Sequence, residues 1–339
     1  MSVMSHLSQG NNCCHLSDDS AFIERTPFMI VTVGAIILSQ TIIGVLGNFS
    51  LLSAHLLLSC TGARLRAIDL ILMHLTIANS LIILSNGVPQ TMAEFGIKQS
   101  FSDLGCHLLS YIHRVGRGVS MGNYCLLSVF QAIKISPRDS CCKHLKFKAP
   151  QYVTLSVSLS WILHMFGNLF FPLHILYVSN TWSLKDISKQ NWGFCHVTYI
   201  DNVSVPVYIT LIAFPEILCT VLIVWTSGSM ILFLHRHKQR VQHIHQNHAS
   251  SRISAERRAT QRILVLVSSF LCFYSLSSLV RMWLALFPDK NRWLFNVGII
   301  ISLCFPIVSP FLVMKDDATV FRLSFVLIMN RISHNCNHN

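Results

Sequence analysis

The sequence predicts an all-α membrane protein in which seven helices form one bundle. Of its 339 residues, 52% are hydrophobic and only 12% are charged, and the mean hydropathy is +0.52. A soluble domain has roughly 25% charged residues. The apolar residues lie in long runs separated by shorter connections along most of the chain, so we expect one membrane domain and exclude an ordinary water-soluble globule.

Seven segments are long and apolar enough to span a bilayer. A spanning helix needs about 20 mostly apolar residues, because every backbone polar group in hydrocarbon must be paired within the protein. The seven segments cover residues 27–58, 68–92, 104–135, 152–178, 205–235, 260–287 and 294–314, and the third is the least apolar. The predicted organisation is therefore an N-terminal segment (1–26), a helical membrane domain (27–314) and a tail (315–339).

The basic residues predict the orientation. Lys and Arg concentrate in the first, third and fifth connections, which the positive-inside rule places in the cytoplasm. The opposite connections carry fewer basic residues, diluted by acidic ones, so the N-terminus is expected outside and the C-terminus inside. The first 20 residues are polar and lack the pattern of a cleavable signal peptide, which leaves targeting to the first helix. Residues 320–329 form a short apolar run suited to a helix lying on the inner membrane surface.

This topology is that of the rhodopsin-like G-protein-coupled receptors, although some transporters and channels share it. More specific signals are the stretches HLTIANSLIILSNGVPQTM (74–92), HRVGRGVSMGNYCLLSVFQAIKISP (113–137), HRHKQRVQHIH (235–245), ERRATQRILVLVSSF (256–270) and CFPIVSPF (304–311). With these stretches the chain resembles the vomeronasal type 1 receptors over nearly all of its length after Arg25.

The resemblance implies a pheromone or chemosignal receptor in the plasma membrane of chemosensory neurons. Such a receptor binds a small organic molecule and activates a heterotrimeric G protein of the inhibitory class. A bitter-taste receptor is the nearest alternative within receptors, and a transporter or channel is the alternative from another class. A transporter would usually show internal repeats or broken helices, which are not clear in this sequence.

Two cysteines are candidates for a disulfide that ties an outer loop to the bundle. Cys106 lies at the outer start of the third helix and Cys195 in the long second outer loop, so both are on the oxidising side. Cys13 and Cys14 are competing partners, and two free thiols are the alternative.

Charged residues at membrane depth are the candidates for a ligand pocket. His113 lies about two turns and Arg117 about three turns inward from the outer end of the third helix, with Arg114 beside them. Buried ionisable groups mark ligand or ion pathways, or else pair with each other. Glu216 in the fifth helix is the candidate partner, so a pocket and an internal ion pair both stay open. Arg281 near the outer end of the sixth helix is a weaker candidate that could simply reach the interface.

The sequence departs from the broad rhodopsin-like pattern at three places. Asn79 stands where the second helix usually carries an aspartate, Gln131 lies within the triplet that usually holds an arginine, and Ser309 precedes Pro310 where an asparagine is usual. The usual arginine lock therefore cannot be carried over. Asn48 and Asn79 are expected to form hydrogen bonds between helices.

A basic inner surface is the expected contact with a G protein. Its candidate residues are Gln131, Lys134, Arg138, Arg236, Lys238, Arg240, Arg257 and Arg258. Positive charge without a partner is the alternative. Several histidines between 235 and 248 suggest metal binding only weakly, because their spacing of two places them on different helix faces.

Other classes of site have little support. Asn202 begins an outer-loop sequon and is the glycosylation candidate. No enzymatic motif is visible, and no cofactor or metal is expected. The net charge of +12 could suggest nucleic acid, but the basic residues lie in membrane-flanking loops and not on a soluble face.

Overall fold

The computed structural model describes residues 27–60, 66–97, 103–135, 151–169, 188–192, 195–199, 204–243, 250–286 and 292–314. Described helices fall within all seven predicted ranges, of which the fourth, 152–178, is described only as far as residue 169. They are α2 (Pro27–Cys60); α3 (Ala67–Ile82), continued by the π-helical turn η1 (Ile83–Gly87) and α4 (Val88–Glu94); α5 (Asp103–Ile135); a helix at 151–169; α7 (Ser204–His243); α8 (Ser250–Leu286); and α9 (Arg292–Met314). The predicted N-terminal segment, the tail and the surface helix at 320–329 lie outside the described residues.

Five of the described helical segments are long and apolar enough to cross a membrane. They are Val31–Cys60, Ala67–Glu94, Phe214–Arg236, Thr260–Trp283 and Trp293–Met314. The third and fourth predicted spans, at α5 and at 151–169, do not reach the same hydropathy over their described residues. The protein is thus a helical multi-pass membrane protein, while the count of seven crossings and the outward N-terminus remain predictions.

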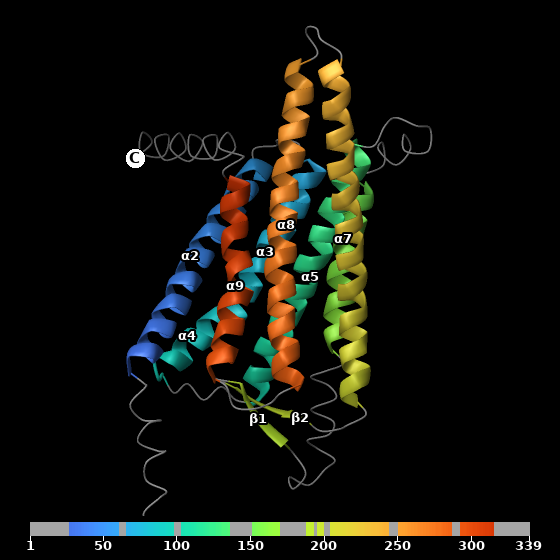
Figure 1. Cartoon of the computed structure of the whole chain (residues 1–339). Coiled ribbons are helices and arrows are strands. Elements are labelled where there is room, and N and C mark those ends of the chain that lie inside the picture. The colour runs from blue at the N-terminus through green and yellow to red at the C-terminus, as the bar shows by residue number, and fades with distance from the viewer. Residues whose placement is uncertain are drawn as a thin grey trace, which may run out of the picture.

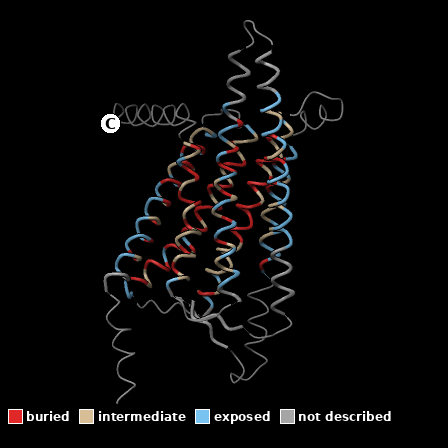
Figure 2. The backbone as a smooth tube through the Cα atoms, in the orientation of Figure 1, coloured by how far each residue is buried: buried red, intermediate tan, exposed pale blue. Residues whose placement is uncertain are grey.

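The helices form a closed bundle, in which α5 contacts α3, α7 and α8. Neighbours pack in the order α2, α3, α5, α7, α8 and α9, and α9 packs back against α2 (Figure 1). Buried residues gather on the inward faces, whereas the outer sides of α2 and α7 are largely exposed (Figure 2). Tyr124 of α5 is fully buried, and its ring stacks on Phe270 at 4.1 Å and meets Phe305 edge-on at 5.0 Å.

The polar residues that lower the hydropathy of α5 form contacts inside the bundle. Its polar side chains point into the bundle and bond to four other helices. Ser120 donates to the Asn79 side chain of α3, and the Tyr124 hydroxyl bonds Ser309 of α9 at 3.0 Å. Ser128 bonds Thr226 of α7 at 2.6 Å. Arg117 bonds α8, as described below. A helix in the middle of a bundle can carry polar groups that a lipid-facing helix cannot, because its neighbours supply the partners.

A proline in α9 explains one of the expected asparagine contacts. Pro310 has no N–H, so the carbonyl of Pro306 four residues earlier lacks its usual helical donor. The side-chain nitrogen of Asn48 in α2 donates to this carbonyl at 2.9 Å and to the Gly44 carbonyl at 2.8 Å. Asn48 therefore satisfies a backbone group that the proline leaves open, and it joins the first helix to the last.

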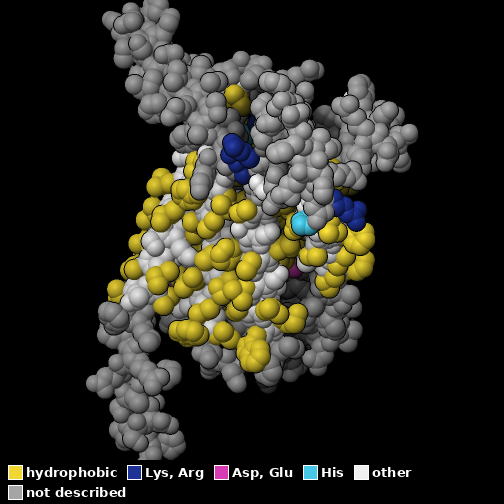
Figure 3. Space-filling model, turned by 45° about the horizontal axis from the view of Figure 1, so that its top comes forward, with side chains coloured by type: hydrophobic (Ala, Val, Ile, Leu, Met, Phe, Trp, Pro, Cys, Tyr) yellow, Lys and Arg dark blue, Asp and Glu magenta, His cyan; other side chains and the backbone are white. Residues whose placement is uncertain are grey.

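The outside of the bundle is apolar over most of its height. Trp225 is 74% exposed and Phe166 is 71% exposed. Figure 3 shows hydrophobic side chains covering the described surface, with Lys and Arg visible toward one end. Such a surface is unfavourable in water, and it suits contact with lipid chains.

Features at the two ends of the bundle differ. At one end α7 and α8 extend well beyond their neighbours (Figure 1), as expected for helices that continue into the cytoplasm. At the opposite end lies an antiparallel hairpin that we did not predict, made of β1 (Ser188–Trp192) and β2 (Cys195–Tyr199). Strand β2 contacts α5.

Glycines of α5 allow the helix at 151–169 to approach closely. A Cβ on Gly118 would overlap the imidazole of His164, whereas a Cβ on Gly228 of α7 would meet nothing within 4 Å among the described residues.

We predict that Gly118→Leu destabilises the protein by about 1–3 kcal/mol through overpacking. The expected result is a lower melting temperature in detergent and less protein at the cell surface. Gly228→Leu is the matched control and should behave like the unchanged chain; equal behaviour of both variants would contradict the prediction.

Candidate functional site

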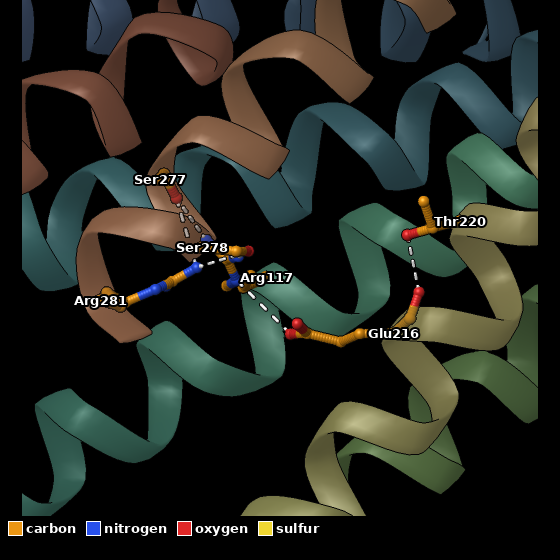
Figure 4. A network of polar contacts seen from close by, with 6 residues as sticks. All are labelled: Arg117, Glu216, Thr220, Ser277, Ser278 and Arg281. Carbon is orange, nitrogen blue, oxygen red and sulfur yellow. Dashed lines mark hydrogen bonds and ion pairs between the residues drawn. The ribbon is translucent and has the colours of Figure 1, made fainter. Parts of the chain in front are cut away.

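A buried arginine joins three helices in the middle of the bundle. The Arg117 side chain of α5 is only 10% exposed, and its Nε lies 3.5 Å from an Oε1 of Glu216 in α7. Its two terminal nitrogens donate to serines of α8, with Nη1 2.9 Å from the Ser277 oxygen and Nη2 2.6 Å from the Ser278 oxygen. The guanidinium of Arg117 thus contacts α7 through Nε and α8 through its two Nη atoms (Figure 4).

An aromatic ring completes this environment. The guanidinium carbon of Arg117 lies 3.8 Å from the ring centroid of Tyr274 in α8, a cation–π contact that gains strength when water is excluded. Tyr274, Ser277, Ser278 and Arg281 recur at spacings of three and four, so they share one face of α8. One face of α8 therefore presents an aromatic ring and two hydroxyls to Arg117 of α5.

Arg281 belongs to the same cluster. Its Nη2 donates to the Ser277 oxygen at 3.2 Å and to the Ser278 oxygen at 3.5 Å, the same two oxygens that Arg117 uses. The side chain is half-buried and turns toward the inside of the bundle (Figure 4). The expectation that Arg281 reaches the membrane interface is therefore less well supported than its place beside Arg117.

A small cavity lies next to the cluster. Its walls include His113, Arg117 and Ser120 of α5 and Tyr274 and Ser277 of α8, and they are completed by Ile82, Phe270, Phe273, Ile301, Ser302, Phe305 and Pro306. The Nδ1 atom of His113 is buried and has no hydrogen-bond partner among the described residues. Arg114 is half-buried on the same helix and does not line this cavity.

The cavity is too small for an organic ligand in this conformation. Its volume of about 30 Å³ has room for water-sized molecules, whereas pockets for small organic molecules measure roughly 300–1,000 Å³. The aromatic side chains Phe270, Phe273 and Tyr274 close it from the side of α8. An organic molecule could enter only if α8 or these side chains move.

The N-terminal end of α5, which the sequence predicts to face outward, carries a disulfide. Cys106 is disulfide-bonded, and its partner lies among the cysteines whose side chains are outside the described residues. Strand β2 begins at Cys195 and packs against α5, which is compatible with the predicted pairing.

Comparison with known proteins identifies the family. The sequence model of the "Vomeronasal organ pheromone receptor family" matches residues 31–326. The chain is 48% identical to Vomeronasal type-1 receptor 4 of Homo sapiens over 87% of this chain and 97% of the relative. The chain belongs to this receptor family. It is also 46% identical to Vomeronasal type-1 receptor 2 of Homo sapiens, over 84% and 72% of the two chains, and 28% identical to Olfactory receptor class A-like protein 1 of Danio rerio, over 85% and 90%.

Membership of this family confirms the resemblance found in the sequence. It also confirms that the chain is a multi-pass protein of the plasma membrane. The family is one of receptors for pheromones and not of enzymes. As a vomeronasal-type receptor, the protein is expected to act with a ligand, a G protein and the lipid membrane.

The candidate residues for contact with a G protein differ in their exposure. Lys134, Arg236 and Arg258 are exposed, whereas Gln131 is only 2% exposed and its side-chain nitrogen has no hydrogen-bond partner in the part of the chain that the structure describes. Contact between Gln131 and a G protein would therefore require the inner end of the bundle to open. Arg138 and Asn202 lie outside the described residues, as do the side chains of Lys238, Arg240 and Arg257.

Sequence reasoning missed three residues of the Arg117 site, which are Tyr274, Ser277 and Ser278. A detectable signal was their spacing relative to Arg281, which places all four on one helix face. That spacing does not say which neighbouring helix the face meets, and serines in membrane helices also bond to their own backbone. Only the packing of α8 against α5 identifies the partner.

A double-mutant cycle tests the energy of the Arg117–Glu216 pair. We predict that Arg117→Met and Glu216→Gln each lower the melting temperature, because each leaves a polar partner in a poorly hydrated place. The double variant should lose less than the sum, with a coupling of about 1–3 kcal/mol.

The control for this cycle is the Arg66–Asp69 pair at the start of α3. Its ions lie 3.0 Å apart, but the Arg66 side chain is 65% exposed, so solvent screening should make its coupling smaller. Additive losses at Arg117 and Glu216 would contradict an energetic role for that pair.

Proposed function

We propose that this family member is a chemosensory G-protein-coupled receptor with seven crossings and an outward N-terminus. It binds a small organic chemosignal in the outer half of the bundle and activates a heterotrimeric G protein of the inhibitory class. The observation that carries this proposal is the buried Arg117 junction of α5, α7 and α8, directly beside a closed cavity. A polar site at membrane depth costs free energy, and such sites are usually functional.

The geometry supports a mechanism in which ligand binding moves α8. The Arg117 contacts with Ser277 and Ser278 hold α8 close to α5, and the cavity beside them has no space for an organic molecule. A ligand that binds only when α8 moves away favours the open conformation over the closed one. This difference in affinity is what shifts the population toward signalling.

A movement of α8 would also reach the inner end. The helix is continuous from Ser250 to Leu286, so it can transmit a displacement along its length. Exposed Arg258 lies on its inner half, and Gln131 is buried on the neighbouring α5. We propose that opening exposes Gln131 between the basic ends of α5, α7 and α8, where the G protein binds.

The experiment that tests this function is a ligand screen in cells. The chain is expressed with a promiscuous G protein, its N-terminus is labelled at the surface of intact cells, and calcium is recorded. A ligand-dependent calcium signal that needs the G protein supports the proposal. Ligand-driven flux or current that persists without any G protein would instead favour a transporter or channel.

The class of G protein is tested in the same cells. Without the promiscuous subunit, an active ligand should lower cyclic AMP, and pertussis toxin should abolish this effect if the inhibitory class carries the signal. A response that the toxin leaves unchanged would contradict the inhibitory assignment while leaving the receptor function intact.

The proposed Cys106–Cys195 disulfide positions the hairpin at the mouth of the bundle. We predict that Cys195→Ala abolishes the response or reduces it at least tenfold, because β2 is then no longer tied to α5. The control is Cys272→Ala, which removes an exposed free thiol of α8 and should leave the response unchanged. Surface labelling is compared for both variants. A normal response of Cys195→Ala at normal surface density would overturn the pairing.

A further inference from the structure

Two guanidinium groups of the Arg117 cluster share the same two oxygens. Ser277 and Ser278 each accept hydrogen bonds from both Arg117 and Arg281. The two arginine nitrogens on Ser277 lie 2.9 and 3.2 Å from its oxygen, so they are within roughly 6 Å of each other, where like charges repel strongly in a poorly hydrated site. Something must offset this repulsion.

The described residues supply only part of the compensating charge. Glu216 pairs with Arg117 from the side away from Arg281 (Figure 4), and the Nε–Oε1 distance of 3.5 Å is long for a charge-assisted bond. Within the part of the chain that the structure describes, Arg281 bonds only the two neutral serines. The cluster therefore carries two cations and one carboxylate.

The cluster also has more hydrogen-bond donors than acceptors. Each serine oxygen accepts from arginines, which leaves its own hydroxyl hydrogen to be donated elsewhere. Neither of these hydrogens has an acceptor among the described residues, and the Nδ1 atom of His113 in the same cavity is unpaired. An acceptor with a negative charge would satisfy the hydroxyls and balance the second guanidinium at once.

We propose that a small inorganic anion, chloride in the outer medium, binds in the cavity at the Arg117 guanidinium and the Ser277 hydroxyl, next to Arg281. Arg117 and Ser277 line this cavity, whereas Arg281 and Ser278 are not among its lining residues, and its volume of about 30 Å³ has room for a particle like water and not for an organic molecule. Arg281 stands five residues before the end of α8, on the side that the sequence predicts to be the outer one. By holding α8 to α5, the bound anion stabilises the closed receptor.

This inference rests on the proposed function only for the meaning of the closed state; anion binding itself is tested on the purified full-length chain without a ligand or a G protein. The melting temperature is measured in detergent at equal ionic strength in sodium chloride, sodium acetate and sodium gluconate. Chloride should raise it by roughly 2–4 °C over gluconate, which is too large for the cavity.

Variants separate this site from a general salt effect. Arg281→Gln should abolish the difference between chloride and gluconate, and Arg281→Lys should keep most of it because the charge remains. Lys134→Gln removes a positive charge from the opposite end of the protein and should keep the full difference.

Three results would overturn the proposal. The first is the same melting temperature in all three salts, and the second is a chloride effect that survives in Arg281→Gln. The third is stronger stabilisation by acetate than by chloride, which would assign the site to the carboxylate of an organic ligand. The calcium assay decides the receptor function separately, so a failure here and a failure there are distinguishable.

Discussion

The structure of this receptor depends on one buried cation in its central helix. Arg117 cannot be left unpaired at membrane depth, and its partners come from α7 and α8, far along the chain. A charge in hydrocarbon costs several kcal/mol, so the three helices can pack together only where Glu216 and the serine pair reach the guanidinium. The same contacts close the cavity beside them. The requirement that stabilises the bundle therefore also holds it in the closed state from which, in our proposal, a ligand opens it.

The other polar contacts of the bundle follow the same logic at lower cost. Neutral groups such as Asn48, Asn79 and Ser128 are buried and form hydrogen bonds with neighbouring helices. Each contributes about 1 kcal/mol, and together they specify which helix faces meet. The Asn48 bond to the Pro306 carbonyl shows that a proline can be accommodated when another helix supplies the missing donor. The seventh helix and the first helix are thereby joined without an ion pair.

The contrast between the two ends of the bundle is relevant to signalling. In the middle of the bundle, α5 and α8 are joined by charged and hydroxyl groups beside a cavity that is too small for an organic molecule in this conformation. Toward the end at which α7 and α8 extend, Gln131 is buried and its side-chain nitrogen has no partner among the described residues, while Lys134, Arg236 and Arg258 of α5, α7 and α8 are exposed. Strong contacts at one end and an incompletely satisfied group at the other suit a helix that pivots when the outer contacts are exchanged for a ligand.

The sequence by itself determined the helical class, the seven helical ranges and the family. Long apolar runs can satisfy their backbone groups only as helices, and the quoted motifs are specific. It also pointed to Arg117 and Glu216, because charges in apolar runs are conspicuous. It did not reveal Ser277, Ser278 or the inward turn of Arg281, nor the β1–β2 hairpin. Serines are common in membrane helices, and a helix periodicity defines a face without naming the neighbour that the face meets. Only the tertiary packing of α8 against α5 decided that two arginines share the same two hydroxyls, since that contact depends on the relative rotation and depth of helices about 160 residues apart in the chain.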